Sequence, residues 1–309
     1  MTRTFSDRPA ERGPTPLLFG IIGPSGSGKT YSALRLATGM QRVTGGEIYV
    51  VDTESNRALH YADRFKFRHV PFTAPFSPLD YLAAIEHCVS RGAKIVVVDS
   101  MSHEHEGVGG VLEWHAAETE RLMEAWHVGA EKAQIPAWAK PKAARRKLLN
   151  ALIQMPVHFI FCFRAKEKVR VGRGEVVQLG FMPIAGEEFV YEATAKALLL
   201  PGASGVPTWQ PEHAGERLMA KLPEQFRQIF SGAAGRPLDE DIGEQLARWA
   251  SGTEAAQEDG LVAAYDACDA PDMLDELEAQ RRAVWPELSP AEKRAVKAAS
   301  QRAQARVTL

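Results

Sequence analysis

The residues with the clearest chemical meaning lie near the start of the chain, in the run Gly-Pro-Ser-Gly-Ser-Gly-Lys-Thr at 23–30. This run matches the pattern G-x-x-x-x-G-K-[ST], in which backbone N–H groups surround phosphate oxygens. Lys29 would reach the β- and γ-phosphates, and the Thr30 hydroxyl would ligate Mg²⁺. The residues expected to contact such a nucleotide are Gly23, Pro24, Ser25, Gly26, Ser27, Gly28, Lys29, Thr30 and Tyr31.

The sequence on either side of this loop fits a phosphate site. An apolar run before it is typical of a buried strand, and residues 31–40 after it are typical of a helix. A helix N-terminus adds a partial positive charge that favours phosphate. The alternative is a glycine-rich turn that binds nothing, and the strand, loop and helix in register argue against it.

Two further acidic positions follow apolar runs. Residues 94–100 read Lys-Ile-Val-Val-Val-Asp-Ser, the Walker B arrangement in which Asp99 would hold Mg²⁺ through water. Residues 49–54 read Tyr-Val-Val-Asp-Thr-Glu and follow the helix after the phosphate loop. Structural roles remain alternatives, because Asp99 can simply end a strand and Asp52 and Glu54 can cap the next helix.

The order of these motifs resembles that of the RecA-type core ATPases, in which a glutamate after the second strand polarises the attacking water. The resemblance assigns that base role to Glu54, with Asp52 as a supporting acid, and makes Lys29 and Glu54 catalytic. RecA-type proteins place a polar sensor, usually glutamine, after the strand that follows Walker B. Here residues 157–163 are followed by Arg164, which is our candidate for the sensor.

The chain is more closely similar to a group of bacteriophage and prophage RecA-like ATPases. The similarity rests on residues 54–59 (Glu-Ser-Asn-Arg-Ala-Leu), 99–107 and 164–168 (Arg-Ala-Lys-Glu-Lys), and it extends over residues 17–250. It implies a Mg²⁺-dependent ATPase, encoded by a phage and acting on single-stranded DNA in recombination, annealing or replication. It also implies a ring or filament of identical subunits, a recombination or annealing protein as partner, and the host cytoplasm as location.

Basic residues occur in two clusters. Lys166, Lys168, Arg170 and Arg173 lie where RecA-type proteins carry a mobile DNA-binding loop, and the first three alternate as in a strand. We expect them to contact DNA or to act in trans at a neighbour's nucleotide, although a charged hairpin edge gives the same pattern. Residues 140–147 form a second basic cluster beside Trp138, with a solvated helix face as the alternative.

The segment His103-Glu104-His105-Glu106 contains residue types that bind metal, but no third ligand is evident from the sequence. We therefore expect a flexible loop over the nucleotide at this place. The cysteines, Cys88, Cys162 and Cys268, have no metal or redox spacing and fit a reducing cytoplasm.

Composition sets broad limits on the class of protein. The 309 residues have a net charge of −2 and are 45% hydrophobic and 25% charged, which is ordinary for a globular protein. Any nucleic-acid site must therefore be local. No stretch approaches 18 apolar residues and no signal-peptide core precedes residue 17, so we expect no membrane association.

Strand and helix patterns alternate along the first two thirds of the chain, which predicts an α/β fold with a doubly wound, mostly parallel sheet. The expected strands are 17–23, 47–52, 94–100, 157–163 and 195–200, and the expected helices are 30–42, 78–91, 111–126 and 142–154. Further helices are expected at 215–230 and 238–250. The predicted organisation is a flexible leader (1–16), a RecA-like core (17–250), a linker (251–260) and a C-terminal extension (261–309) with helices at 261–283 and 290–307.

Other functions remain open at this stage. A nucleotide-dependent switch or assembly factor that binds protein in place of DNA would use the C-terminal helices as its partner surface. A small-molecule kinase is less favoured, because no arginine-bearing lid or acceptor pocket is recognisable. No Asn-Lys-x-Asp motif for guanine is present, which favours ATP over GTP.

Overall fold

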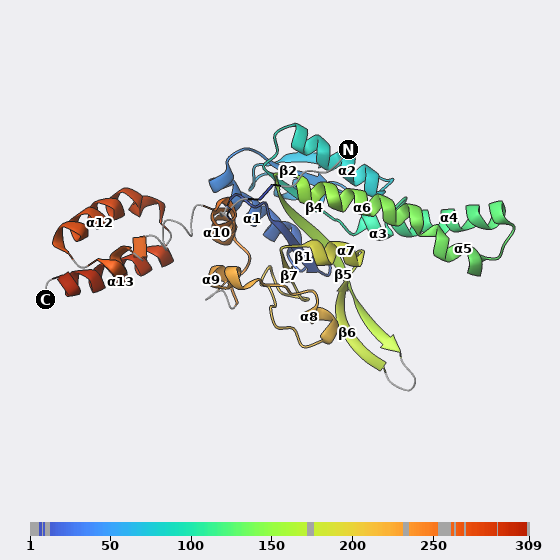
Figure 1. Cartoon of the computed structure of the whole chain (residues 1–309). Helices are drawn as coiled ribbons and strands as arrows, with labels where there is room; N and C mark the ends of the chain where they lie inside the picture. Colours follow the sequence, from blue (N-terminus) through green and yellow to red (C-terminus); the bar gives the residue numbers. More distant parts are fainter. Residues whose placement is uncertain are drawn as a thin grey trace. The chain divides into compact units, whose positions relative to one another are not determined.

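The chain folds into two compact units in the computed structural model, Pro16–Ala247 and a second unit made of Met1–Thr15 with Arg248–Leu309. The structure describes residues 6, 7, 9, 13–171, 176–230, 235–252 and 261–307, except 263, 269 and 289. Figure 1 shows the elements of both units in sequence colours. Among the helices described, none has the length and apolar character needed to span a bilayer.

The larger unit is built on a seven-stranded sheet. Its parallel strands lie in the order β3 (Arg68–Pro71), β2 (Ile48–Asp52), β4 (Ile95–Asp99), β5 (His158–Val171), β1 (Leu18–Gly23) and β7 (Ala195–Leu198). The predicted strands are all present, and the prediction of a mostly parallel α/β sheet is confirmed. The sequence did not predict β3, which is short and has no continuous apolar run.

Helices cover both faces of this sheet, as a doubly wound fold requires. Strands β1, β2 and β4 are buried along their whole length, which explains why they are continuously apolar. One face packs against α2 (Pro78–Ser90), α6 (Ala139–Gln154) and α7 (Glu187–Glu192). The helix α1 (Lys29–Thr44) contacts β4 and β5 and buries Leu34, Leu36 and Met40.

Strand register brings the acidic and basic residues of the sequence motifs to one edge. Asp52 at the end of β2 is level with Asp99 at the end of β4, and Asp99 is level with Cys162 in β5. Gly23, at the end of β1, is level with Arg164 in β5. The carboxyl ends of parallel strands are where α/β proteins bind ligands.

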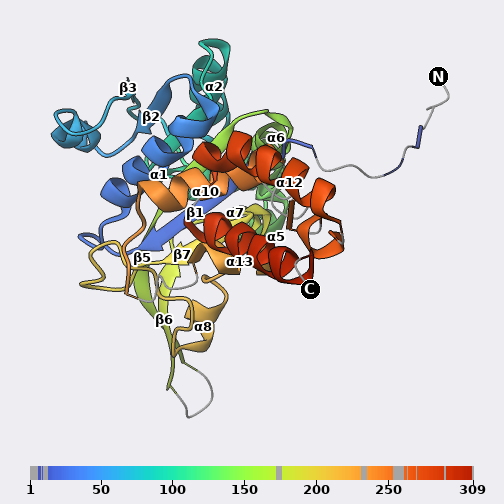
Figure 2. The ribbon, with the colours of Figure 1, turned by 90° about the vertical axis from the view of Figure 1, so that its left-hand side faces the viewer.

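Strand β5 continues beyond the sheet and forms a hairpin with the antiparallel strand β6 (Val176–Pro183). Figures 1 and 2 show the hairpin projecting from the body of the unit. The register shifts after Lys168, where Gly180 of β6 has a φ of 75°. This conformation favours glycine and lets β6 bulge. The predicted strand ended at residue 163, because residues 166–171 are exposed and carry no buried apolar pattern.

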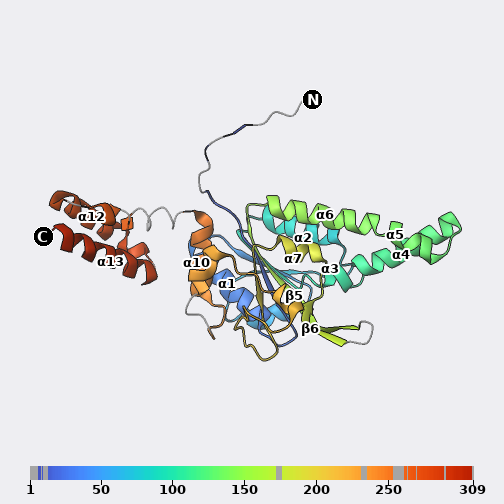
Figure 3. The ribbon, with the colours of Figure 1, turned by 60° about the horizontal axis from the view of Figure 1, so that its bottom comes forward.

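A helical excursion connects β4 with β5. It consists of α3 (His103–Glu106), α4 (Val111–Trp126), α5 (Ala130–Ala137) and α6, and α4 and α5 form a projecting pair in Figure 3. A small apolar cluster at Leu122, Ala133 and Ala137 holds that pair together.

The prediction of a flexible loop at 103–106 is wrong. The segment is a short helix in which Glu104 is buried.

The prediction of one helix at 215–230 is also wrong. The segment contains α8 (Ala214–Arg217), a 3-10 turn at Glu224–Phe226 and α9 (Arg227–Phe230). Between them Lys221 pairs with Lys196 of β7 in an antiparallel bridge, and Pro223 cannot continue a helix interior. The helix expected at 238–250 is α10 (Glu240–Ser251).

The second unit has its own apolar core. Residues 261–262 and 264–267 are helical, followed by α12 (Pro271–Val284), a 3-10 turn at Trp285–Glu287 and α13 (Pro290–Val307). Their core includes Tyr265, Leu277 and Val296. The single helix expected at 261–283 is therefore interrupted, because Pro271 favours a helix start over a helix interior. Residues 253–260 of the expected linker lie outside the described residues.

Candidate nucleotide site

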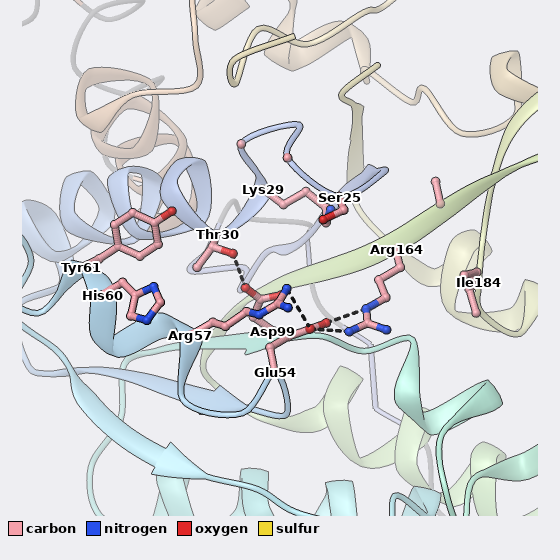
Figure 4. A pocket seen from close by; sticks show the side chains of 13 residues that line it. Ser25, Lys29, Thr30, Glu54, Arg57, His60, Tyr61, Asp99, Arg164 and Ile184 are labelled. Carbon is pink, nitrogen blue, oxygen red and sulfur yellow. Dashed lines mark hydrogen bonds and ion pairs between the residues drawn. The ribbon is translucent and has the colours of Figure 1, made fainter. Parts of the chain in front are cut away.

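A cavity of about 520 Å³ opens at the carboxyl edge of the sheet. Figure 4 shows that side chains from separate motifs point into it. Its lining residues are Ser25, Gly26, Gly28, Lys29, Thr30, Glu54, Arg57, His60, Tyr61, Asp99, Arg164, Ala165 and Ile184.

The phosphate loop has the backbone conformation that its glycines permit. Gly26 and Gly28 have φ values of 77° and 94°, in the region that favours glycine. The ammonium group of Lys29 donates to the Pro24 carbonyl oxygen at 2.7 Å, so it lies across its own loop. Burial lowers the pKa of Lys29, and the nearby carboxylates of Asp99 and Glu54 act in the opposite direction.

Three expected loop residues, Gly23, Pro24 and Ser27, build the loop and do not line the cavity. Ser27 is buried, and its hydroxyl donates to the Pro24 carbonyl at 2.9 Å. Gly23 leaves no space for a side chain, because a Cβ there would lie 2.5 Å from the Leu199 carbonyl oxygen.

The turn at 202–206 packs against the phosphate loop. The backbone N–H of Gly205 donates to the Ser27 carbonyl at 3.1 Å, and a Cβ on Gly28 would lie 2.8 Å from the Gly205 nitrogen. The turn-rich segment that follows β7 therefore fixes the shape of a loop far away in the sequence.

Thr30 and Asp99 are in direct contact. The Thr30 hydroxyl donates to Asp99 Oδ2 at 2.5 Å, although the two residues come from different elements. Asp99 is 4% exposed, and this burial raises its pKa to about 6, against the opposing effect of the Thr30 hydrogen bond. The peptide bond from Asp99 to Ser100 is cis. A hydroxyl and a carboxylate side by side are hard oxygen ligands that fit Mg²⁺, which also takes water and phosphate oxygens.

Glu54 and Arg164 form a two-pronged ion pair inside the cavity (Figure 4). Arg164 Nε donates to Glu54 Oε1 at 2.7 Å, and Arg164 Nη2 donates to Glu54 Oε2. The guanidinium of Arg57 lies 3.9 Å from the same carboxylate. Burial acts to raise the pKa of Glu54, but the hydrogen bonds and charge of Arg164 outweigh it and leave the pKa below its usual range.

Asp52 has a different position from Glu54. Its two oxygens accept from the backbone N–H groups of Glu54 (2.8 Å) and Ala58 (3.0 Å), and Oδ2 also contacts His69 at 3.1 Å. Asp52 is 2% exposed and does not line the cavity. The capping alternative therefore describes Asp52, whereas Glu54 points into the cavity.

Five lining residues, Arg57, His60, Tyr61, Ala165 and Ile184, were not expected from the sequence. Arg57, His60 and Tyr61 belong to a 3-10 helix at Arg57–Tyr61, and Asp52 accepts a hydrogen bond from the Ala58 N–H in its first turn. The sequence signal that could have identified the first three is their position, as polar and aromatic residues shortly after Glu54. Tyr31, expected at the nucleotide, is not in the lining, and the centroid of its ring lies 5.7 Å from that of the lining residue Tyr61.

The histidines at 103 and 105 are held by different partners. His103 Nδ1 lies 2.8 Å from the Thr53 hydroxyl, and its ring stacks on Phe76. His105 Nδ1 instead lies 3.0 Å from Arg145. Within the described part of the chain, no three His, Cys, Asp or Glu side chains lie close enough together to hold a metal ion.

The two basic clusters differ in exposure. Lys166, Lys168 and Arg170 are exposed on one face of β5 in the hairpin, whereas Arg173 lies outside the described residues. In the cluster at 140–147, Arg145 is buried and pairs with Glu104 at 2.8 Å. Arg145 is therefore a structural residue and not part of a DNA-binding face.

Comparisons with known proteins assign no family to this chain. Neither a protein-family model nor a curated protein matches it. The interpretation of the site consequently rests on its geometry.

Proposed function

We propose that the chain binds a Mg²⁺–nucleoside triphosphate, with ATP as the favoured nucleotide, and hydrolyses its terminal phosphate through a RecA-type core. The observation that carries this proposal is the convergence of Lys29, the Thr30–Asp99 pair and Glu54 on one cavity. These groups come from the first residues of α1, from the end of β4 and from the segment that follows β2. The register of the sheet thus supports the proposal.

Each group has a distinct task in this scheme. Loop N–H groups and Lys29 bind the β- and γ-phosphates, and Lys29 moves from the Pro24 carbonyl to the phosphate oxygens. Thr30 and Asp99 hold Mg²⁺, which when bound would neutralise charge on the phosphates. Glu54 accepts a hydrogen bond from the attacking water and orients it, because its lowered pKa keeps it ionised at neutral pH. The wall of Arg57, His60 and Tyr61 faces the base and sugar.

Arg164 supports control of hydrolysis by the nucleotide itself. While it binds both oxygens of Glu54, that carboxylate has fewer free acceptor sites for water. A γ-phosphate competes for the guanidinium, since Arg binds phosphate as well as carboxylate. Arg164 then acts as the sensor and releases Glu54.

We further propose that hydrolysis serves work on single-stranded DNA in recombination, annealing or replication, within an oligomer of this chain. The exposed row Lys166, Lys168 and Arg170 supports a phosphate-binding or trans-acting hairpin, and it begins two residues after Arg164. The competing function is a slow nucleotide switch that binds a protein partner. The Glu54–Arg164 ion pair favours slow basal turnover, which also fits this second function.

The enzymatic proposal is tested with Glu54→Gln and Lys29→Ala. We expect Glu54→Gln to bind a fluorescent ATP analogue with near-normal affinity in Mg²⁺ while phosphate release falls by about 10²-fold or more. Lys29→Ala should lose binding as well. Normal phosphate release by Glu54→Gln would overturn the role given to that residue.

The DNA proposal is tested separately by measuring phosphate release with and without oligo-thymidine at low and high salt. Stimulation that disappears with Lys166→Ala/Lys168→Ala, together with binding that weakens steeply in salt, supports the DNA function. Slow turnover without any DNA binding at low salt would favour the switch.

A further inference from the structure

The surface of α6 carries a stripe that the nucleotide site does not use. Trp138, Lys142 and Arg146 are spaced by four residues and therefore share one helix face. Two of their basic neighbours are engaged elsewhere: Arg145 is buried with Glu104, and Lys140 lies 3.0 Å from Glu118.

This stripe lines a groove of about 420 Å³, a size that fits a few residues of a bound peptide. The groove lies where α5 meets α6, and Arg145 joins this region to α7 through Glu188. Figure 3 shows α5 and α6 in succession, with α7 beside α6. The lining residues are Ile135, Pro136, Trp138, Ala139, Lys142, Arg146 and Glu188.

The floor of the groove is apolar, and one of its side chains, Trp138, is held in place. Ile135 is 82% exposed, the largest value among the large apolar side chains described. It precedes Pro136, which lies in the last turn of α5. The ring of Trp138 stacks on His115 with centroids 3.9 Å apart, and Lys142 Nζ lies 5.5 Å from the same ring. Because these contacts fix the Trp138 ring before a ligand binds, a contact with that ring has a low entropic cost.

The rim of the groove is positively charged. Among the described residues, no carboxylate lies within ion-pair distance of Lys142 or Arg146. Glu188, the one acid in the lining, is 3.4 Å from Arg145, which pairs more closely with Glu104, so Lys142 and Arg146 still leave the lining with an excess of one positive charge. Two cations are thus free to bind an incoming anion beside an exposed apolar floor.

We propose that this groove docks an acidic peptide segment of a partner protein, one with an aliphatic or aromatic side chain next to two carboxylates. The apolar side chain covers Ile135 and Pro136, and the carboxylates pair with Lys142 and Arg146. Single-stranded nucleic acid fits less well, because His115 already stacks on Trp138 and two cations form only a short track for a polyanion. The groove is lined by residues other than those of the nucleotide cavity, so this inference stands independently of the proposed hydrolysis.

The test is fluorescence anisotropy with the full chain and labelled peptides centred on Asp-Asp-Leu-Phe, Lys-Lys-Leu-Phe or Asp-Asp-Ser-Ser. We expect only the first peptide to bind, and binding to weaken with salt. Lys142→Glu/Arg146→Glu should weaken it by about ten-fold or more, because two favourable charge contacts become repulsive. Lys66→Glu/Lys147→Glu changes the net charge equally at exposed positions outside the groove and should alter the Kd less than two-fold.

Circular dichroism and ATP-analogue binding establish that each variant is folded. The proposal is overturned if Asp-Asp-Leu-Phe fails to bind at low salt, or if both double variants weaken it equally. It is also overturned if labelled oligo-thymidine binds the chain and only Lys142→Glu/Arg146→Glu abolishes that binding, since the groove is then a nucleic-acid site.

Discussion

Two neighbouring carboxylates in the cavity have opposite pKa shifts, and the cause of each is local. Asp99 is buried beside a neutral hydroxyl, so its pKa rises to about 6. Glu54 is also desolvated, but it has a guanidinium partner and its pKa falls. Such divergence separates a carboxylate whose charged form a guanidinium stabilises from one whose charged form burial disfavours.

The first residue-scale prediction concerns Arg164→Gln. With the guanidinium removed, burial of Glu54 remains and its pKa rises. If Glu54 is the base, the acid limb of the hydrolysis rate should move to higher pH, because the active form is the ionised one. The pH profile of kcat/KM checks this, because it reports the free enzyme, in which Arg164 still pairs with Glu54.

The matched control is Arg57→Gln. Arg57 is farther from Glu54 and 66% exposed, so solvent screens its charge and the acid limb should move much less. An acid limb that stays in place in Arg164→Gln would show that the ion pair does not set the ionisation of Glu54.

A second prediction concerns Asp99→Asn in the absence of Mg²⁺. The pKa of Asp99 in the folded chain is about 6, whereas the ordinary value is 3.8, so the folded chain binds this proton more tightly than the unfolded chain. The folded state therefore loses stability as the pH rises from about 4 to about 6. Asn removes this cost. At pH 8 we expect Asp99→Asn to increase the free energy of unfolding by up to about 3 kcal/mol.

Urea unfolding at pH 8 and pH 4.5 measures the effect, which should shrink at the lower pH. Added Mg²⁺ and ATP analogue should stabilise the wild type more than Asp99→Asn. A variant less stable than the wild type at pH 8 would contradict the pKa argument.

At the scale of elements, the helix α1 packs tightly on α10 through glycines. A Cβ on Gly39 would lie 1.8 Å from the Glu240 carbonyl oxygen, and a Cβ on Gly243 would lie 2.1 Å from that of Leu36. Arg35 and Glu240 join the same helices by hydrogen bonds of 2.9 and 3.0 Å. This contact supports the helix whose N-terminus faces the cavity.

We therefore expect Gly39→Ala to destabilise the chain by about 1–3 kcal/mol, because the added methyl forces α1 and α10 apart. Helix propensity alone would make the Ala variant more stable by about 1 kcal/mol. The sign of the measured change in the free energy of unfolding therefore shows whether packing or propensity dominates. Urea unfolding provides the measurement. Gly129→Ala is the control, since a Cβ there meets nothing within 4 Å.

At the scale of the whole molecule, the two compact units have separate apolar cores. The core on one face of the large sheet includes Phe161 and Tyr81, whereas the C-terminal core is centred on Tyr265. Separate cores predict separate unfolding.

Ending the chain after Gly252 should therefore leave ATP-analogue affinity within about two-fold of that of the full chain. Calorimetry should show the loss of one transition. Tyr265→Ala in the full chain is the complementary variant, because it removes a fully buried ring and should lower only the transition of the C-terminal unit. Loss of nucleotide binding in either variant would show that the units depend on each other.

The sequence alone predicted most of the parallel sheet and its main helices. The reason is that strands buried on both faces are continuously apolar and P-loop glycines have a fixed spacing. It missed β6, whose exposed residues carry no such pattern, and it joined helices across Pro223 and Pro271. It also left open whether Asp52 and Glu54 serve as caps or as active groups, since both follow one strand.

Tertiary structure decided which of these residues meet. Strand order and register place Arg164 between the phosphate loop and Asp99, where it pairs with Glu54 from 110 positions earlier in the chain. The same packing buries Arg145 against Glu104 and leaves Lys142 and Arg146 on the surface. Periodicity and motif spacing act over a few residues, so the sequence determined the elements and the phosphate loop. Partners brought together by folding depend on long-range packing, which only the tertiary structure specified.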